Sequence, residues 1–133
     1  MIKPKVVFVS VHNSCRSQVA EALGKYFAGD IFENYSTGTE LKSGINPDAV
    51  RIIKNRYGIE MEQSQYPKLI TDIPAPDIKI SMGYNAECPY MGKEFDDNWE
   101  LDDPTGQSDQ KFNEIIDAIQ ENILWLMSEL EAY

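Results

Sequence analysis

Residues 5–9 (KVVFV) are a short apolar run rich in β-branched side chains, and a helical pattern starts a few residues later, at residues 17–28. A run that is apolar on both faces indicates a strand buried on both faces, as in a parallel sheet. The apolar residues of the helical segment repeat at helical spacing: Val19, Ala20, Leu23 and Phe27. Apolar runs and helical patterns go on alternating along the chain, which predicts consecutive βαβ units.

The other elements are predicted from the same patterns. Further strands are predicted at residues 31–37 and 78–82, with a weak fourth candidate at residues 99–101. Asn46 as the N-cap, Pro47 at the first helical position and Gly58 as the end predict a second helix. A long last helix is predicted from a cap at Ser108, and its apolar positions are Phe112, Ile115, Ile116, Ile119, Ile123, Leu126, Met127 and Leu130. Residues 88–106 are predicted to be irregular, with a turn at Asp96 and Asp97.

The composition limits the partners. A net charge of −10 over 133 residues argues against nucleic acids and anionic membranes. No apolar run approaches the roughly 20 residues of a membrane span, and residues 1–5 lead into a strand without the pattern of a signal peptide. Cys15, Cys88 and the single histidine, His12, lack a zinc-ligand spacing, so no metal site is predicted. We expect one monomeric, cytoplasmic domain over residues 1–133 with reduced thiols.

A polar turn, residues 10–17 (SVHNSCRS), joins the first strand to the first helix. Ligands of open α/β sheets bind outside the carboxyl ends of the strands, and the N–H groups at a helix start are unpaired and partly positive. Arg16 adds a planar cation that can hold two oxygens at once. We therefore predict an oxyanion site formed by Val11, His12, Asn13, Ser14, Cys15, Arg16 and Ser17. The turn lacks the glycine patterns of nucleotide-binding loops, and a plain βα connection is the alternative interpretation.

From residue 10 to Arg16 the spacing resembles the C-x5-R-S loop of the low-molecular-weight protein tyrosine phosphatases and their relatives, the thioredoxin-coupled arsenate reductases. The segments NSCRSQ (13–18), YSTGT (35–39) and INPDAV (45–50) resemble the reductase version. Further matching residues follow in the family's order: Met82-Gly83, Cys88-Pro89 and Asp102-Asp103-Pro104. The resemblance covers nearly the whole chain. It implies a three-layer α/β fold, a four-stranded parallel sheet with helices on both faces, and arsenate, phosphate or sulfate as the ligand.

The first loop position is a cysteine in the resembled family, and its thiolate attacks phosphorus or arsenic; here it is Ser10. A serine hydroxyl is far less acidic than a thiol and needs an adjacent base. His12 is the candidate base, but side chains of such a loop mostly point outwards, so no Ser10–His12 pair is expected. The resemblance therefore implies an arsenate reductase-like protein that keeps the pocket and lacks the nucleophile. Loss of the nucleophile from an enzyme and a natural binding protein both remain open.

Two groups of residues beside the loop have expected roles. By resemblance, Asp103 matches the general acid that protonates a leaving oxygen. Asn13 is expected to hold the loop by internal hydrogen bonds, and Ser17 to do the same or to donate to a thiolate at position 10. The remaining acidic residues of this region are interpreted as solvated charges: Asp96, Asp97, Glu100 and Asp102.

The cysteines distinguish the possible activities. Cys88 matches the outer of two thiols that pass a disulfide to thioredoxin, the implied external reductant, and no bound cofactor is implied. The inner position is Met82, whose thioether cannot relay a disulfide. Cys15 is either a packing residue or a resolving thiol. A reductase would use position 10, Arg16, Asp103, Cys15 and Cys88 as catalytic residues; the alternatives are a small phosphatase and a non-catalytic binder of an oxyanion or phospho-ligand.

Overall fold

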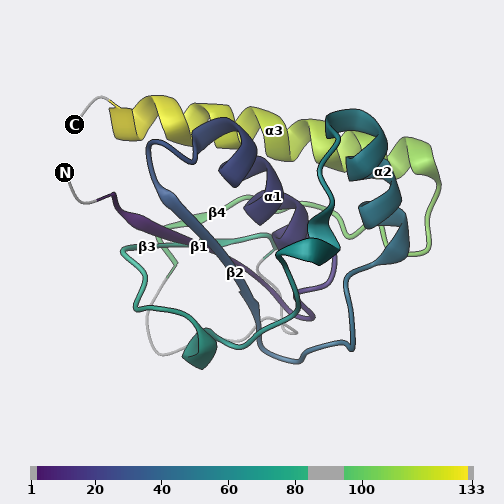
Figure 1. The fold of residues 1–133 in the computed structure, drawn as a ribbon, viewed down its shortest axis with the longest axis horizontal. Helices are drawn as coiled ribbons and strands as arrows, with labels where there is room; N and C mark the ends of the chain where they lie inside the picture. Colours follow the sequence, from purple (N-terminus) through teal and green to yellow (C-terminus); the bar gives the residue numbers. More distant parts are fainter. Residues whose placement is uncertain (1–2, 84–94, 132–133) are drawn as a thin grey trace.

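A computed structural model of the protein describes residues 3–83 and 95–131. Four strands and three α-helices alternate along these residues (Figure 1). In chain order the elements are β1 (Lys5–Ser10), α1 (Arg16–Ala28), β2 (Glu33–Gly38), α2 (Pro47–Tyr57), the 3-10 helices η1 (Met61–Gln63) and η2 (Ile70–Asp72), β3 (Ile78–Ser81), β4 (Asp97–Asn98) and α3 (Asp109–Glu131). This order confirms the predicted alternation.

The strands form one parallel sheet in the order β2-β1-β3-β4. Strand β1 is internal, and the four valine and phenylalanine residues after Lys5 are fully buried. Ser10 pairs with Gly38, and Val9 pairs with Ser81, so the carboxyl ends of three strands meet at one edge. The turn of residues 10–17 leaves the sheet at that edge, which is where α/β folds place ligands.

The two faces of β1 lie against different layers. Val6 and Phe8 belong to the larger core, which includes the buried residues of α1 and α3. Val7 and Val9 point to the other face, where η2 contributes Ile70 to a smaller cluster (Figure 1). The three-layer α/β fold with helices on both faces of a four-stranded parallel sheet is confirmed. The second face carries a 3-10 helix among the described residues, while the α-helices lie on the first.

The helix boundaries follow from local capping where the sequence supplies caps. Asn46 Oδ1 accepts from the amides of Asp48 and Ala49, at 2.8 and 3.2 Å, so α2 begins as predicted. Gly58 ends it in the left-handed region at φ 73°. Ser108 Oγ accepts from the Lys111 amide at 3.3 Å, which confirms the predicted start of α3.

The fourth strand was predicted two residues too late. It is Asp97–Asn98 rather than residues 99–101, so Asp97 lies in a strand and not in a turn. The Trp99 amide still donates to Ser81 O and the Leu101 amide to Met82 O, but Glu100 between them has φ 46°, which interrupts the extended strand. The Trp99 ring packs on Phe8 with their centroids 5.5 Å apart. Strand β2 also starts later than predicted, because the Phe32 amide still donates to Ala28 O at the end of α1.

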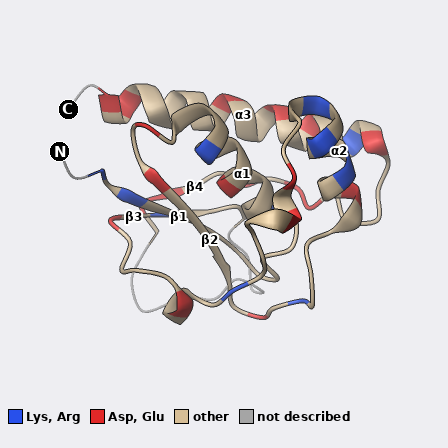
Figure 2. Cartoon of the chain, in the orientation of Figure 1, with Lys and Arg blue, Asp and Glu red and all other residues tan. Residues whose placement is uncertain are grey.

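The charged residues of α2 and α3 form ion pairs with each other (Figure 2). Arg51 binds Asp109 at 2.8 Å and Arg56 binds Asp117 at 2.6 Å. These two arginines are therefore already paired with carboxylates on the surface of the helices.

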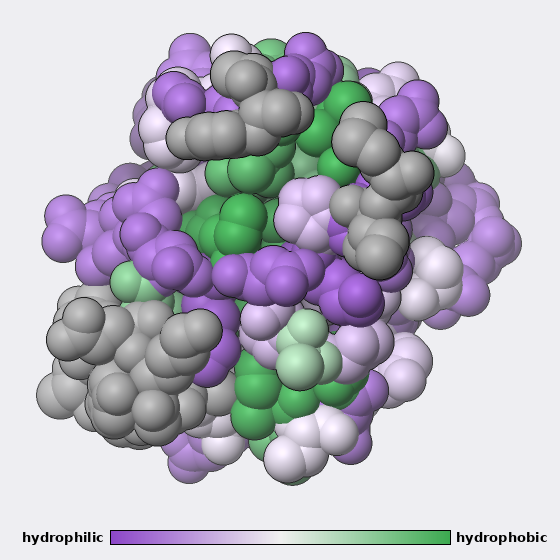
Figure 3. Space-filling view, turned by 90° about the vertical axis from the view of Figure 1, so that its left-hand side faces the viewer, coloured by the Kyte–Doolittle hydropathy of each residue, from purple (hydrophilic) through white to green (hydrophobic). Residues whose placement is uncertain are grey.

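On the face that carries the chain ends, a band of hydrophilic residues divides the apolar surface into separate areas (Figure 3). No helix in the described part of the chain is long and apolar enough to cross a membrane.

Candidate functional site

A cavity of about 390 Å³ lies where the turn of residues 10–17 meets the segment after β4. Most of its lining comes from residues predicted to form the site, together with neighbours on two other segments. The lining residues are Ser10, Val11, His12, Ser14, Cys15, Arg16, Gly83, Glu100, Leu101, Asp102 and Asp103. The structure thus brings the predicted loop and Asp103 to the same cavity, although they are far apart in the sequence.

The backbone of this loop is curved, and its amides lack acceptors within the described residues. Asn13 has φ 50°, a left-handed conformation that asparagine tolerates better than most residues. None of the amides of residues 11–17 donates to an acceptor among residues 3–83 and 95–131. A Cβ on Gly38 would lie 2.7 Å from Val11 O, so β2 can approach the loop this closely only with glycine there. Free amides in a curved turn before a helix are suited to an anion.

Arg16 is held at the cavity by the backbone. Its Nη1 donates to Leu101 O at 2.6 Å. A Cβ on Gly83 would lie 2.8 Å from that same Nη1, so the absence of a side chain at residue 83 leaves room for the guanidinium. Within the described residues Arg16 has no carboxylate at ion-pair distance, unlike Arg51 and Arg56. Its charge therefore remains available to a ligand.

Ser10 and Ser17 form a hydrogen-bonded pair beneath the loop, with 2.6 Å between their hydroxyl oxygens. Asn13 Nδ2 donates to Ser17 Oγ at 2.9 Å, which confirms the expected loop-holding role of Asn13. Since Ser17 accepts from Asn13, its own proton can go to Ser10 Oγ. In that arrangement the hydroxyl proton of Ser10 is free for the cavity that this residue lines, and in the reverse arrangement Ser17 Oγ accepts from both Asn13 and Ser10.

His12 turns away from Ser10, as expected. Its Nδ1 donates to Glu40 O at 2.8 Å. The Lys42 amide also donates to His12 O at 3.4 Å, so the segment after β2 lies against His12. Ser10 consequently has no basic side chain as a hydrogen-bond partner in the described part of the chain. The arrangement lacks the nucleophile–base contact that a reactive serine requires.

The opposite wall of the cavity is acidic. Glu100, with φ 46°, and Asp102 line it beside Asp103, and Asp102 also pairs with Lys111 at 3.0 Å. Partial burial acts to raise the pKa of Asp103, but hydrogen bonds from Thr105 and the charge of Arg16 outweigh it, so this pKa lies below its usual value. Asp103 is therefore ionised at neutral pH in the unliganded protein. Glu100 is exposed, as expected for a solvated charge, and it also lines the cavity.

Cys15 lies at the start of α1 and is buried, with 6% of its surface exposed. Burial, reinforced by the negative charge of Asp103 and opposed by Arg16, raises the pKa of the Cys15 thiol to about 12. Thiolate is the reactive form, so Cys15 is unreactive at neutral pH in this state. The geometry favours the packing interpretation over a resolving thiol.

Alkylation of Cys15 by iodoacetamide is expected to be slow in the native protein. A shift from 9.0 to about 12 lowers the thiolate fraction at pH 8 roughly a thousandfold. The measurement is alkylation followed by mass spectrometry in a Cys88→Ser background, from pH 7 to 11. The native rate should keep rising with pH, while the rate in urea should level off near the ordinary thiol pKa. A native rate that levels off in the same range would contradict the assignment.

Not every predicted residue lies on the cavity. Asn13 and Ser17 belong to the loop but do not line the cavity, and their side chains form hydrogen bonds within the loop. Met82 is fully buried and its amide donates to Val9 O, so the inner relay position is a core residue. Cys88 lies outside the described residues.

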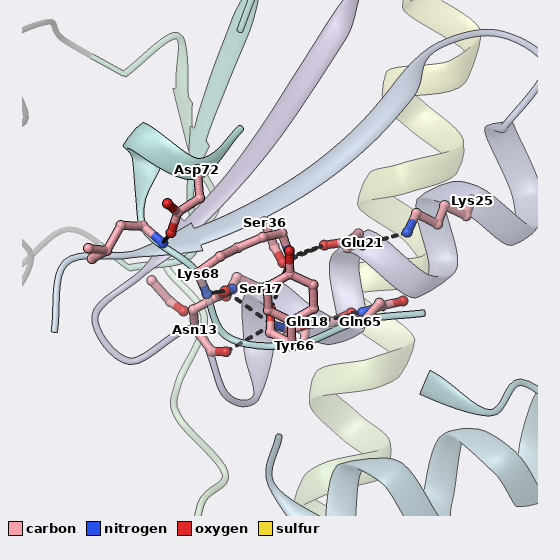
Figure 4. A network of polar contacts seen from close by, with 12 residues as sticks. Asn13, Ser17, Gln18, Glu21, Lys25, Ser36, Gln65, Tyr66, Lys68 and Asp72 are labelled. Atoms are coloured by element: carbon pink, nitrogen blue, oxygen red, sulfur yellow. Dashed lines mark hydrogen bonds and ion pairs between the residues drawn. The ribbon is translucent and has the colours of Figure 1, made fainter. Parts of the chain in front are cut away.

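Sequence reasoning missed a buried polar cluster on the far side of the loop (Figure 4). Its members come from α1, β2 and the segment after η1: Gln18, Glu21, Ser36, Gln65 and Lys68. Gln18 and Glu21 lie on the buried side of α1, three residues apart. Polar residues at that spacing beside the apolar stripe were the available signal, because buried polar side chains require partners.

Comparison with known proteins gives concordant matches. A family model described as low molecular weight phosphotyrosine protein phosphatase matches residues 5–133. Arsenate reductase 1 of Staphylococcus epidermidis is 35% identical over 124 residues, which are 90% of this chain and 92% of that protein. A structure described as an arsenate reductase in the phosphate binding state is 30% identical, with a TM-score of 0.80 over 96% of this chain and 98% of that one. The thioredoxin-dependent arsenate reductase Cg_ArsC1' of Corynebacterium glutamicum is 36% identical, with a TM-score of 0.76 over 98% of this chain and 63% of that one.

Proposed function

The chain belongs to the low molecular weight phosphotyrosine protein phosphatase family, and we propose that it is an arsenate reductase-like member that binds a tetrahedral oxyanion at residues 10–17 without turning it over. Arsenate, phosphate and sulfate are the ligands that suit the site. Relatives named arsenate reductase, at 30–36% identity over most of this chain, support the arsenate branch.

The free amides around one cavity carry this proposal. Amides 11–17 have no acceptor in the described part of the chain, and Arg16 beside them has no carboxylate partner there. Backbone amides and a guanidinium together stabilise an anion more than either does alone, because each is a charge-assisted donor held in place before binding. This local positive site is compatible with a net charge of −10, since the other arginines are paired on the surface.

Ser10 supports binding rather than turnover. Its oxygen is hydrogen-bonded to Ser17 and has no basic partner among the described residues, so it remains a neutral hydroxyl that can donate to the ligand. A neutral hydroxyl does not repel an anion, whereas a thiolate at the same position would. We therefore assign residue 10 to oxyanion binding in this chain.

A small phosphatase is the second candidate, and Met82 favours it over a complete reductase. The thioether is fully buried where a disulfide relay needs a thiol, and Cys15 is held protonated. A phosphatase requires neither group. If position 10 carried a thiol, Arg16 would bind the phosphoryl group and Asp103 would protonate the leaving oxygen. Thioredoxin would be a partner only in the reductase case, with Cys88 as its contact. In either case we propose a monomeric protein of the cytoplasm.

Oxyanion binding by the unaltered chain is the direct test. We expect arsenate and phosphate to bind with a dissociation constant of about 1 mM or lower, which corresponds to roughly 4 kcal/mol. Titration followed by 1H–15N spectra should shift the amides of residues 11–17 first, and calorimetry should give the affinity. Nitrate, which is planar, serves as the control anion and should not compete. Absence of saturable shifts at residues 11–17 would refute the proposal.

A further inference from the structure

A buried ion pair lies near the oxyanion loop (Figure 4), and neither of its residues lines the cavity. Lys68 Nζ is 3.1 Å from Glu21 Oε1, and their side chains are 9% and 3% exposed. Glu21 also accepts from Ser36 Oγ at 2.6 Å and, through Oε2, from Lys25 at 2.6 Å. Lys25 reaches it from the surface, with 43% of its side chain exposed. Glu21 therefore holds two lysines, one internal and one external.

The backbone of Lys68 contacts the loop directly. Its amide donates to Asn13 Oδ1 at 2.9 Å, and its carbonyl accepts from the Gly38 amide at 2.9 Å. One residue thus has three anchors: the side chain to α1, the carbonyl to the end of β2 and the amide to the loop. The segment around Lys68, residues 64–69, has neither helix nor strand of its own, so its position depends on such anchors.

A second contact joins the same segment to Asn13 through Gln18. Gln65 Nε2 donates to Gln18 Oε1 at 2.8 Å, and Gln18 Nε2 donates to Asn13 Oδ1 at 3.1 Å and to Asn13 O at 3.0 Å. Because Asn13 Oδ1 accepts from both Lys68 and Gln18, its amide nitrogen faces Ser17. Asn13 Nδ2 donates to Ser17 Oγ, and Ser17 Oγ is hydrogen-bonded to Ser10 Oγ, so the orientation of Asn13 is connected to Ser10 through Ser17.

We propose that Lys68 is a positioning residue for the oxyanion loop: its ion pair with Glu21 fixes the segment whose backbone orients Asn13, and the hydrogen bonds of Asn13 with Ser17 and of Ser17 with Ser10 carry this positioning to the Ser10 hydroxyl. This inference rests on the proposed oxyanion binding. Lys68 does not line the cavity, and its contact with Asn13 is the hydrogen bond from its own backbone amide. A small displacement of the donors from their positions is costly, because hydrogen bonds weaken steeply with distance and angle.

The pair of lysines on Glu21 supplies a matched test. Lys68→Met and Lys25→Met each remove one ammonium from the same carboxylate and change the net charge equally. Only Lys68 belongs to the segment that contacts Asn13. We expect Lys68→Met to weaken phosphate binding about tenfold or more and Lys25→Met to change it less than about twofold, although both lower the melting temperature. Equal phosphate affinities for the two variants would overturn the inference.

A double variant separates positioning from stability. In the single variant Lys68→Met, the buried Glu21 carboxylate loses one of its two lysine partners. Adding Glu21→Gln removes that buried charge, so the melting temperature of the double variant should recover in part. Phosphate affinity should stay low, because the segment remains without its anchor. Recovery of affinity together with the melting temperature would mean a purely structural role and would also overturn the inference.

A readout without phosphate keeps the inference distinct from the proposed function. In a Ser10→Cys, Cys88→Ser background, the introduced thiol can be titrated by its absorbance near 240 nm. Lys68→Met should raise its pKa by about one unit, because the Ser17 donor is no longer aimed at the thiolate, and Lys25→Met should not. If the unaltered chain fails to bind phosphate but this contrast appears, the proposed function fails and the positioning role stands. If phosphate binds and neither contrast appears, the positioning role fails alone.

Discussion

The Ser10→Cys variant is expected to consume NADPH in an arsenate-dependent reaction when thioredoxin and its reductase are supplied, and the unaltered chain is not. A thiol at residue 10 would receive the Ser17 hydrogen bond and the nearby charge of Arg16, both of which favour the thiolate. Serine there has no base to activate it. Losing the nucleophile from such a site costs on the order of 10⁴- to 10⁶-fold in rate, so the contrast should be nearly all-or-none.

The chemistry of the variant can be followed step by step. The thiolate forms a sulfur–arsenic bond while an arsenic–oxygen bond breaks, and Asp103 gives its proton to the departing oxygen. A second thiol, for which Cys88 is the candidate because Cys15 is buried and protonated, then attacks the sulfur. The new disulfide leaves the electron pair of the sulfur–arsenic bond on arsenic, which is reduced to arsenite, and thioredoxin reduces the disulfide.

Two further substitutions in the Ser10→Cys background identify the activity. A reductase should lose activity with Cys88→Ser, because Met82 offers no alternative thiol. A phosphatase should hydrolyse p-nitrophenyl phosphate regardless of Cys88→Ser and should be impaired by Asp103→Asn. If arsenate binds to the Ser10→Cys variant but neither reaction appears, the chain is an oxyanion binder. The serine at residue 10 would then not be the reason for its lack of turnover.

Replacing Arg16 should have the second largest effect. Arg16→Ala removes a permanent cation and up to two charge-assisted hydrogen bonds, each worth about 1.5–3 kcal/mol, so arsenate and phosphate should bind at least about 100-fold more weakly. The tether to Leu101 O is also lost, so the segment that carries Asp103 loses a contact with the loop. Calorimetric titration of each anion measures the change.

A charge-matched control makes the Arg16 result specific. Arg51→Ala removes the same charge from α2, where the guanidinium pairs with Asp109 on the surface. Its phosphate affinity should remain within about twofold, since a pair exposed to water is screened from the cavity. Arg16→Lys should be intermediate, because an ammonium keeps the charge but not the planar pair of donors. Similar losses for Arg16→Ala and Arg51→Ala would show that net charge, and not this residue, sets the affinity.

The charge of Asp103 affects both anion binding and the reaction of the Ser10→Cys variant. Its pKa is lowered in the unliganded protein, so its carboxylate opposes a doubly charged anion nearby. Binding such an anion would raise the pKa of Asp103, because two negative groups at one cavity favour a shared proton. The same effect would make Asp103 a proton donor only when the ligand is present, as the acid role requires.

The predictions from sequence were most accurate where the controlling interactions are local. The cap at Asn46, the stop at Gly58 and the apolar repeat of α3 lie within a few residues of the structure that they determine. They failed at β4, because the bounds of an edge strand depend on its pairing with a distant strand, here β3. The loop of residues 10–17 could be predicted because it is also local: its side chains and amides come from one continuous turn.

The amino-acid sequence alone determined the order of the elements, the position of the loop and the identity of the residue at its first position. Only the tertiary structure decided what surrounds that loop. Arg16 meets Leu101 across 85 residues, and Asn13 meets Lys68 across 55. No periodic pattern links such partners, because their contact depends on where irregular segments lie after the core has packed. The position of Lys68 beside Asn13 could therefore not be predicted from the sequence.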